Sequence, residues 1–112
     1  MATEDAMPRF LVERVLGWPW TPDDGPLGGG WWRTDWGERI FHPPDFTTWE
    51  GFGLLLTALA KAGRAPSIEG YGDLWEVVLF EEYHTPHKVT RDSPQRALML
   101  AAAKAYGWKE GV

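Results

Sequence analysis

The stretch DLWEVVLFEE, residues 73–82, decides the fold that this sequence predicts. Side chains alternate between the two faces of a strand. One face then carries Leu74, Val78 and Phe80, and the other carries Trp75, Val77 and Leu79. Both faces are apolar apart from Glu76 and the acidic end, and a strand of this kind is covered on both sides. We therefore expect an α+β fold in which a small, mostly antiparallel sheet is sandwiched between helices, in α/β/α layers.

The remaining strands are expected on either side of this stretch. Short strands are predicted at residues 31–34 and 39–42, joined by a turn through 35–37, and a strand at 87–91 would pair with 73–82. Residues 64–73 are typical of turns. Residues 19–30, rich in proline and glycine, are predicted to form a flexible loop.

Three helices complete the predicted fold. The first covers about residues 3–16 and ends at Gly17. The second begins with Thr47 as its cap, because Glu50 three residues later completes a capping box, and it ends at Gly63. The third begins at Pro94 behind the cap Ser93 and stops near Gly107.

Composition bounds the class of protein. The chain has 112 residues, 44% hydrophobic and 24% charged, which predicts one globular domain over residues 1–112. Its net charge of −5 argues against a partner that is a nucleic acid polymer. The absence of cysteine excludes disulfides, the polar N-terminus argues against a secretory signal, and the apolar runs are too short to cross a membrane. We expect a cytoplasmic protein.

Eight tryptophans are too many for a small domain to bury completely. Trp75 is expected in the core, and Trp18 and Trp49 in the core or at half-buried helix ends. Another group, Trp31, Trp32 and Trp36, follows the glycine-rich loop and flanks Arg33. Because Trp31 and Trp32 are adjacent on a strand, they point to opposite faces. This group is a candidate ligand site, and the alternatives are a loop lid on the sheet or a contact between subunits.

A second candidate site comprises His84, His87, Lys88 and Arg91, just before the last helix. The basic side chains of this group and the N-terminus of the helix could hold a phosphate. Ser93, as the helix cap, and the negative charge of Asp92 would compete with the phosphate for this position. The spacing of the two histidines matches no zinc signature, so no metal site is predicted. No nucleophile, phosphate-binding loop or acid–base pair has a recognisable catalytic spacing, and we therefore predict a protein without enzymatic activity or cofactor.

Several segments resemble the phage ABA sandwich domain family. They are Arg14-Val15-Leu16-Gly17-Trp18, the aromatic middle of the chain, Trp75 in its strand, and the alanine-rich run at residues 97–105. The resemblance implies a helix/sheet/helix sandwich and an origin in a phage or prophage. It transfers no functional residue, because the matching positions are core and cap positions.

The resemblance, together with the lack of a catalytic motif, implies a phage accessory protein that counters a host defence by binding. In the first hypothesis it sequesters a nucleotide-type signalling molecule: indoles stack on the base, and Arg33, Lys88 and Arg91 contact phosphate. One alternative is an inhibitor that binds a host protein through the segment that carries Trp31, Trp32 and Trp36. The other is a virion assembly protein. Surplus indoles and a helix of small residues also predict a homo-oligomer. The resemblance to phage proteins implies that it lies in the host cytoplasm.

Overall fold

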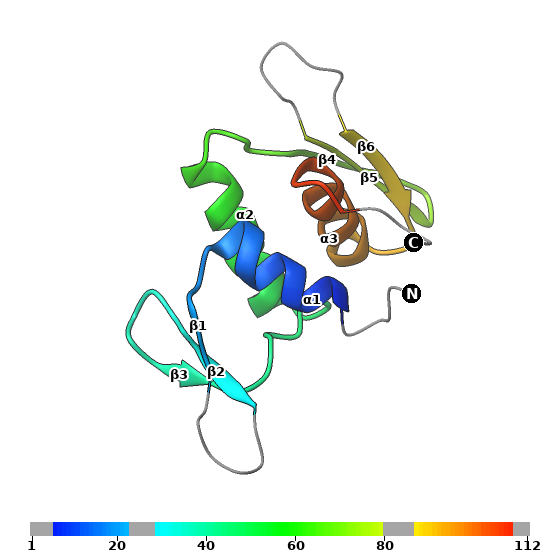
Figure 1. Ribbon diagram of the computed structural model, residues 1–112. Helices are drawn as coiled ribbons and strands as arrows, with labels where there is room; N and C mark the ends of the chain where they lie inside the picture. The colour runs from blue at the N-terminus through cyan, green and yellow to red at the C-terminus, as the bar shows by residue number, and fades with distance from the viewer. Residues whose placement is uncertain (1–5, 23–28, 80–86, 109–112) are drawn as a thin grey trace.

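The chain folds into two small sheets with helices between them (Figure 1). The computed structural model describes residues 6–22, 29–79 and 87–108. Within these residues the first antiparallel sheet is formed by β1 (Trp20–Pro22), β2 (Gly30–Arg33) and β3 (Arg39–Ile40). The second is formed by β4 (Ser67–Tyr71), β5 (Leu74–Leu79) and β6 (His87–Arg91).

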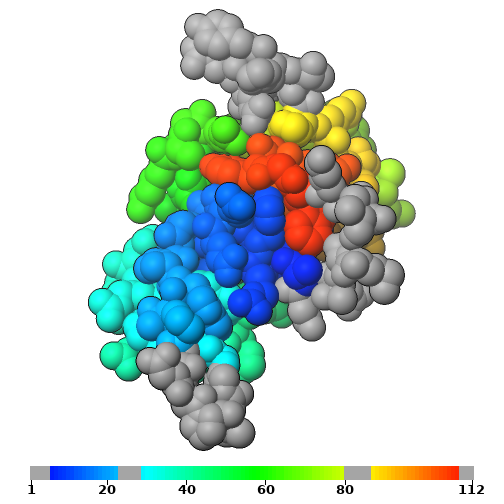
Figure 2. Space-filling view, viewed as in Figure 1, coloured from blue at the N-terminus to red at the C-terminus, as the bar shows by residue number. Residues whose placement is uncertain are grey.

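The helices of the described residues lie between the two sheets. They are α1 (Ala6–Phe10), the π-helix η1 (Leu11–Leu16), α2 (Trp49–Lys61) and α3 (Pro94–Ala105). Helix α3 packs on β5 and β6 and also contacts α2 and η1. Figure 2 shows the surface of α1 and η1 between the first sheet and α3. The α+β class and the antiparallel pairing are confirmed.

The order of the layers differs from the prediction, because helices cover the second sheet on one face only. Val77 and Leu79 of β5 are buried on the face that packs against α3. On the opposite face Leu74 is 49% exposed and Tyr71 on the neighbouring strand is 56% exposed. The prediction of a strand covered on both sides is therefore wrong. The physical reason is that polar residues of β4 and β6 surround the few apolar side chains of this face.

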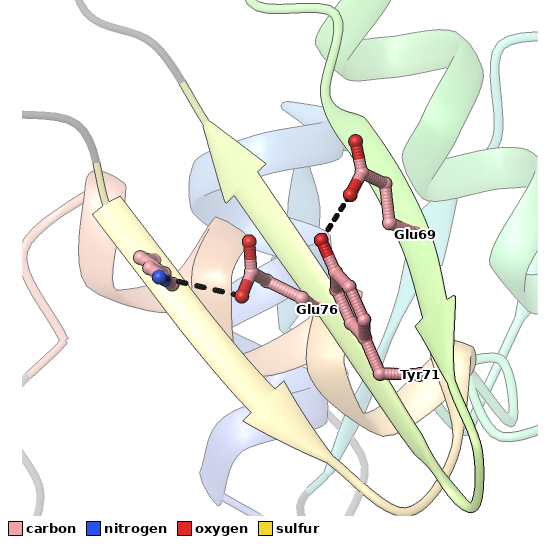
Figure 3. A network of polar contacts seen from close by, with 4 residues as sticks. Glu69, Tyr71 and Glu76 are labelled. Carbon is pink, nitrogen blue, oxygen red and sulfur yellow. Dashed lines mark hydrogen bonds and ion pairs between the residues drawn. The ribbon is translucent and has the colours of Figure 1, made fainter.

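Polar side chains contact one another on the outer face of the second sheet, as expected of a face that is exposed to solvent. Tyr71 donates its hydroxyl hydrogen to the carboxylate of Glu69, and Lys88 Nζ lies 3.3 Å from Glu76 Oε2 (Figure 3). Trp75 was expected in the core, yet it is 36% exposed. It lies at the start of β5, over Gly70 of the paired strand, rather than under the middle of α3. Residues 80–82 of the predicted strand lie outside the described residues.

Tryptophans attach the first sheet to the helical layer. Trp32 is 2% exposed, and its ring lies 4.4 Å from that of Trp20, its partner in the β1–β2 register. The Arg9 guanidinium of α1 lies over both rings, 5.1 Å from Trp20 and 5.3 Å from Trp32. A side chain at Gly30 would come within 2.4 Å of Trp20, so this position accepts only glycine.

Two strands lie where turns or a loop were predicted. Strand β1 falls inside the predicted loop at 19–30, and β4 falls inside the predicted turns at 64–73. Each is paired antiparallel with a neighbour, so partner strands override weak local patterns. Residues 23–28 of the predicted loop lie outside the described residues. The predicted strand at 39–42 is shorter, because only Arg39 and Ile40 pair with β2.

Helix ends follow the capping rules, with one correction. Gly17 ends the first helix with a φ of 71°, and Ser93 caps α3 by accepting the backbone N–H of Arg96 at 3.1 Å, both as predicted. The cap of α2, however, is Thr48, which accepts the N–H of Gly51 at 3.1 Å. Thr47 instead bonds to the carboxylate of Asp45.

The first helix is also not a uniform α-helix. Its last six residues, Leu11–Leu16, have the wider π geometry, which helical periodicity cannot distinguish over so short a segment. Trp18 N–H bonds back to the Val12 carbonyl oxygen at 3.1 Å, and Trp18 itself is buried as predicted. Trp49, in contrast, is 67% exposed at the start of α2, so its predicted burial is wrong.

Two glycines of α2 have opposite roles. A Cβ at Gly51 would come within 2.2 Å of the Asp45 carbonyl oxygen, whereas a Cβ at Gly53 would meet nothing within 4 Å. We expect Gly51→Ala to lower the free energy of unfolding by about 2 kcal/mol or more, because overpacking forces backbone to move. Gly53→Ala should raise it by about 0.5–1 kcal/mol through helix propensity. Urea denaturation of both variants checks this pair, and equal effects would contradict the close approach of residue 45 to α2.

Candidate functional site

The outer face of the first sheet brings two arginines close to one tryptophan ring. Trp31 and Arg33 alternate with buried Trp32 along β2, so both point away from the helices. Arg39 of β3 is the register partner of Arg33. The guanidinium carbon lies 4.5 Å from the Trp31 ring centroid for Arg39 and 5.6 Å for Arg33. We call these three residues the Trp31 face.

The charge of the Trp31 face is unusual for this chain. Arg33 and Arg39 are both exposed, and like charges directly opposite one another on paired strands are destabilising. Among the residues that the structure describes, neither guanidinium forms an ion pair with a carboxylate. The chain as a whole carries a net charge of −5. A local excess of positive charge beside an indole therefore favours an anion with an aromatic group.

The side chains of this face have the chemistry to recognise a phosphate and a base. A guanidinium presents planar donors that match a phosphate with two hydrogen bonds. An indole ring offers a surface on which a base stacks, at about 1–3 kcal/mol per base. Arg33 and Arg39 lie on the same side of the sheet as Trp31, so one nucleotide-sized ligand can contact all three.

The second predicted group lies elsewhere. Lys88 and Arg91 are on β6 of the second sheet, and the helical layer separates them from the Trp31 face (Figure 1). Lys88 pairs with Glu76, and Arg91 donates to the Thr90 carbonyl oxygen at 2.7 Å. His87 is half-buried on the same strand, and His84 lies outside the described residues. One small ligand cannot contact Arg33, Lys88 and Arg91 within a single copy.

Within the first group, the tryptophans also separate. Trp31 and Trp32 point to opposite faces of β2, as predicted, and Trp32 is too deeply buried to contact a ligand. Trp36 lies in the turn after β2, where it is 61% exposed and packs edge-on against Trp18 with ring centroids 5.4 Å apart. It borders a separate cavity and not the Trp31 face.

Arg39 is the residue that sequence reasoning missed. The turn decides its position: Thr34 and Glu38 close the hairpin through the Thr34 N–H, which lies 2.9 Å from the Glu38 carbonyl oxygen. Gly37 has a φ of 86°, which favours glycine. This closure pairs Arg33 with Arg39. The sequence did indicate the turn at residues 35–37 and a strand that begins at Arg39, but it gave no sign that Arg39 would lie against the Trp31 ring.

Compared with models of protein families, with characterised proteins and with solved structures, the chain shows no match. The resemblance to the phage ABA sandwich family therefore stays a prediction. None of the helices in residues 6–22, 29–79 and 87–108 has the length and apolar character needed to cross a bilayer.

The hydrogen bonds of Asp45 lead to a prediction about its pKa. Asp45 and Trp36 line the same cavity. Hydrogen bonds from the Thr47 hydroxyl and backbone N–H stabilise the carboxylate and hold the pKa of Asp45 below its ordinary value. We expect Thr47→Ala to raise that pKa, because the hydroxyl bond makes the largest contribution. Carbon-detected NMR titration of the Asp45 carboxyl measures it.

The pH dependence of stability has a definite sign. Since the folded-state pKa of Asp45 is lowered, its contribution is complete above the unfolded-state pKa and is lost as the pH falls through the folded-state pKa. Thr47→Ala should therefore flatten the acid limb of stability against pH. An Asp45 pKa that is the same in both proteins would contradict this assignment.

Proposed function

We propose that this chain is a non-enzymatic binding protein that sequesters a nucleotide-type ligand on the Trp31 face. The observation that carries the proposal is the gathering of two guanidinium groups, those of Arg33 and Arg39, within 5.6 Å and 4.5 Å of the Trp31 ring on one face of the sheet. In the bound state the base stacks on the indole, and the two arginines bind phosphate oxygens. Displacing the arginines from the ring costs little, because exposed cation–π contacts contribute only about 0.5–1 kcal/mol.

The proposed setting is the cytoplasm of a bacterial host. It rests on the resemblance to small phage proteins, and a counter-defence role follows from it: a protein without catalytic machinery can remove a signalling nucleotide only by holding it. The amount of nucleotide that can be sequestered then equals the number of binding sites. The protein must therefore reach a concentration similar to that of the signalling nucleotide.

Calorimetric titration with a panel of linear and cyclic nucleotides tests the proposal. We expect at least one nucleotide to bind and Trp31→Ala to weaken its binding about ten- to hundredfold, the equivalent of one lost stacking contact. Arg33→Ser with Arg39→Ser should also weaken binding and reduce its salt dependence.

Matched controls come from the second predicted group. Lys88→Gln and Arg91→Gln change the charge equally on the other sheet and should leave nucleotide affinity unchanged. Loss of binding in these variants but not in the Trp31 face variants would move the site to β6. Absence of heat from every nucleotide, at protein concentrations well above micromolar, would reject the proposal.

A second candidate function is inhibition of a host protein by direct binding. It is favoured by the large exposed side chains that lie away from the Trp31 face: Trp36 at 61%, Phe41 at 64% and Trp49 at 67% exposure. Exposed aromatic side chains are typical anchors of protein interfaces. Under this hypothesis a stoichiometric partner co-purifies with the wild type and with Trp31→Ala, and is lost from Phe41→Ala or Trp49→Ala. Native mass spectrometry of the same samples reports the subunit number.

A further inference from the structure

A cavity of about 340 Å³ lies between the β2–β3 turn and the first turns of α2. It is distinct from the Trp31 face, because it borders Trp36, Glu38 and the side of the hairpin that carries Ile40. Trp18 and Trp36 form its aromatic wall, and their rings meet edge-to-face at 5.4 Å. Its volume lies within the range of sites for small molecules.

Carboxylates provide the charge around this cavity. Glu38, Asp45 and Glu50 border it, and the lining side chains that the structure describes include no lysine or arginine. Hydrogen bonds from Thr47 favour the ionised form of Asp45. His42 is the other ionisable lining residue. The first-turn N–H of Gly51 is already bonded to Thr48 Oγ1, at 3.1 Å, and so is not available to an anion. The cavity therefore selects for positive charge.

The arrangement excludes a compact inorganic cation as the best ligand. A metal ion needs several oxygen or nitrogen ligands within about 2–2.6 Å of one point. In the part of the chain that the structure describes, no three His, Asp or Glu side chains gather closely enough to hold one. The acids are instead distributed around a partly aromatic hollow, which suits a larger cation whose charge is spread over alkyl groups.

The orientation of Trp36 supports the same ligand. Its Nε1–H donates to Glu38 Oε2 at 2.8 Å, so the ring is held in place although it is 61% exposed. Because the indole N–H is bonded to a carboxylate, the electron-rich ring face is what Trp36 can offer to a cation. A cation near the cavity mouth would interact with this ring face and with the nearby acids at once.

We propose that the cavity between Trp36 and α2 binds an alkylated ammonium group, carried either by a free small molecule or by a methylated lysine side chain. The ammonium group lies against the indole of Trp36 and is neutralised by Glu38, Asp45 and Glu50. The proposal is independent of nucleotide binding, since it uses none of the residues of the Trp31 face.

Titration with choline and with its uncharged isostere 3,3-dimethylbutan-1-ol separates charge from shape. The probes are followed by calorimetry and by the NMR signal of the Trp36 indole N–H. We expect choline to bind with a dissociation constant on the order of millimolar, which is typical of so small a ligand. The isostere should bind about tenfold more weakly or worse. Equal affinities would overturn the proposal, because they would indicate a merely apolar hollow.

Substitutions at Trp36 measure how much its aromatic ring contributes to choline affinity. Choline affinity should fall from Trp36 to Trp36→Phe and further to Trp36→Leu, because tryptophan offers the strongest cation–π surface. Glu50→Gln, which leaves the Trp36–Trp18 contact in place, should weaken choline binding and not the isostere. Glu69→Gln is the matched control for the loss of a carboxylate, since Glu69 lies on β4 and does not line the cavity, and this variant should bind choline like the wild type.

The source of the ammonium group is resolved by a third probe, Nα-acetyl-Nε-trimethyllysine amide. Tighter binding than choline assigns the cavity to a protein side chain, whereas weaker binding assigns it to a free molecule, and either outcome supports an alkylammonium site. Choline binding that is unchanged in both Trp36→Leu and Glu50→Gln, or no binding of choline or the lysine probe at tens of millimolar, would overturn it. Nucleotide titration of the same variants keeps this result separate from the fate of the Trp31 face.

Discussion

The burial of Trp32 is the constraint on which both candidate sites depend. Its ring is packed against Trp20 and lies under the Arg9 guanidinium, so β2 has one orientation relative to the helical layer. Because side chains alternate along a strand, inward Trp32 requires outward Trp31 and Arg33. A shift of one residue would bury an arginine and expose the packed indole, at a cost that no surface contact offsets. The close contact of Gly30 with the Trp20 ring favours the same register, because a residue with a side chain would not fit at this position.

One hairpin contributes to two candidate sites of opposite charge. Its strands place Arg33 and Arg39 on the outer face, while its turn places Trp36 and Glu38 beside α2. The chain reverses direction between them, with Gly37 at positive φ, and Thr34 closes the turn as both donor and acceptor to Glu38. A positive face and a negative cavity can coexist so closely only because the sheet lies between them. Because the two sites share no residue, the two proposed ligands would bind independently of one another.

Local patterns predicted the fold class but not the order of its layers. Alternation in residues 74–79 identified a strand, and Ser93 and Gly17 marked helix ends that the structure confirms. The same alternation indicated that helices cover both faces of this strand. It carries no information on the side chains that β4 and β6 place beside β5. Glu69, Thr90 and Lys88 make the outer face polar enough for solvent. Whether helices pack on a face depends on the side chains of all the strands in the sheet. The sequence of one strand is therefore not enough to predict it.

The candidate site shows the same division. The sequence by itself determined that indoles outnumber what a small core can bury, and that Trp31 and Trp32 face opposite ways, because composition and strand periodicity are local properties. Only the tertiary structure decided that Arg39 joins Arg33, that Trp36 faces an acidic cavity, and that Lys88 and Arg91 lie on another sheet. These placements follow from strand pairing and from the packing of the helices between the sheets. Contacts between segments that are far apart in the sequence decide both, and residue spacing along the chain does not contain that information.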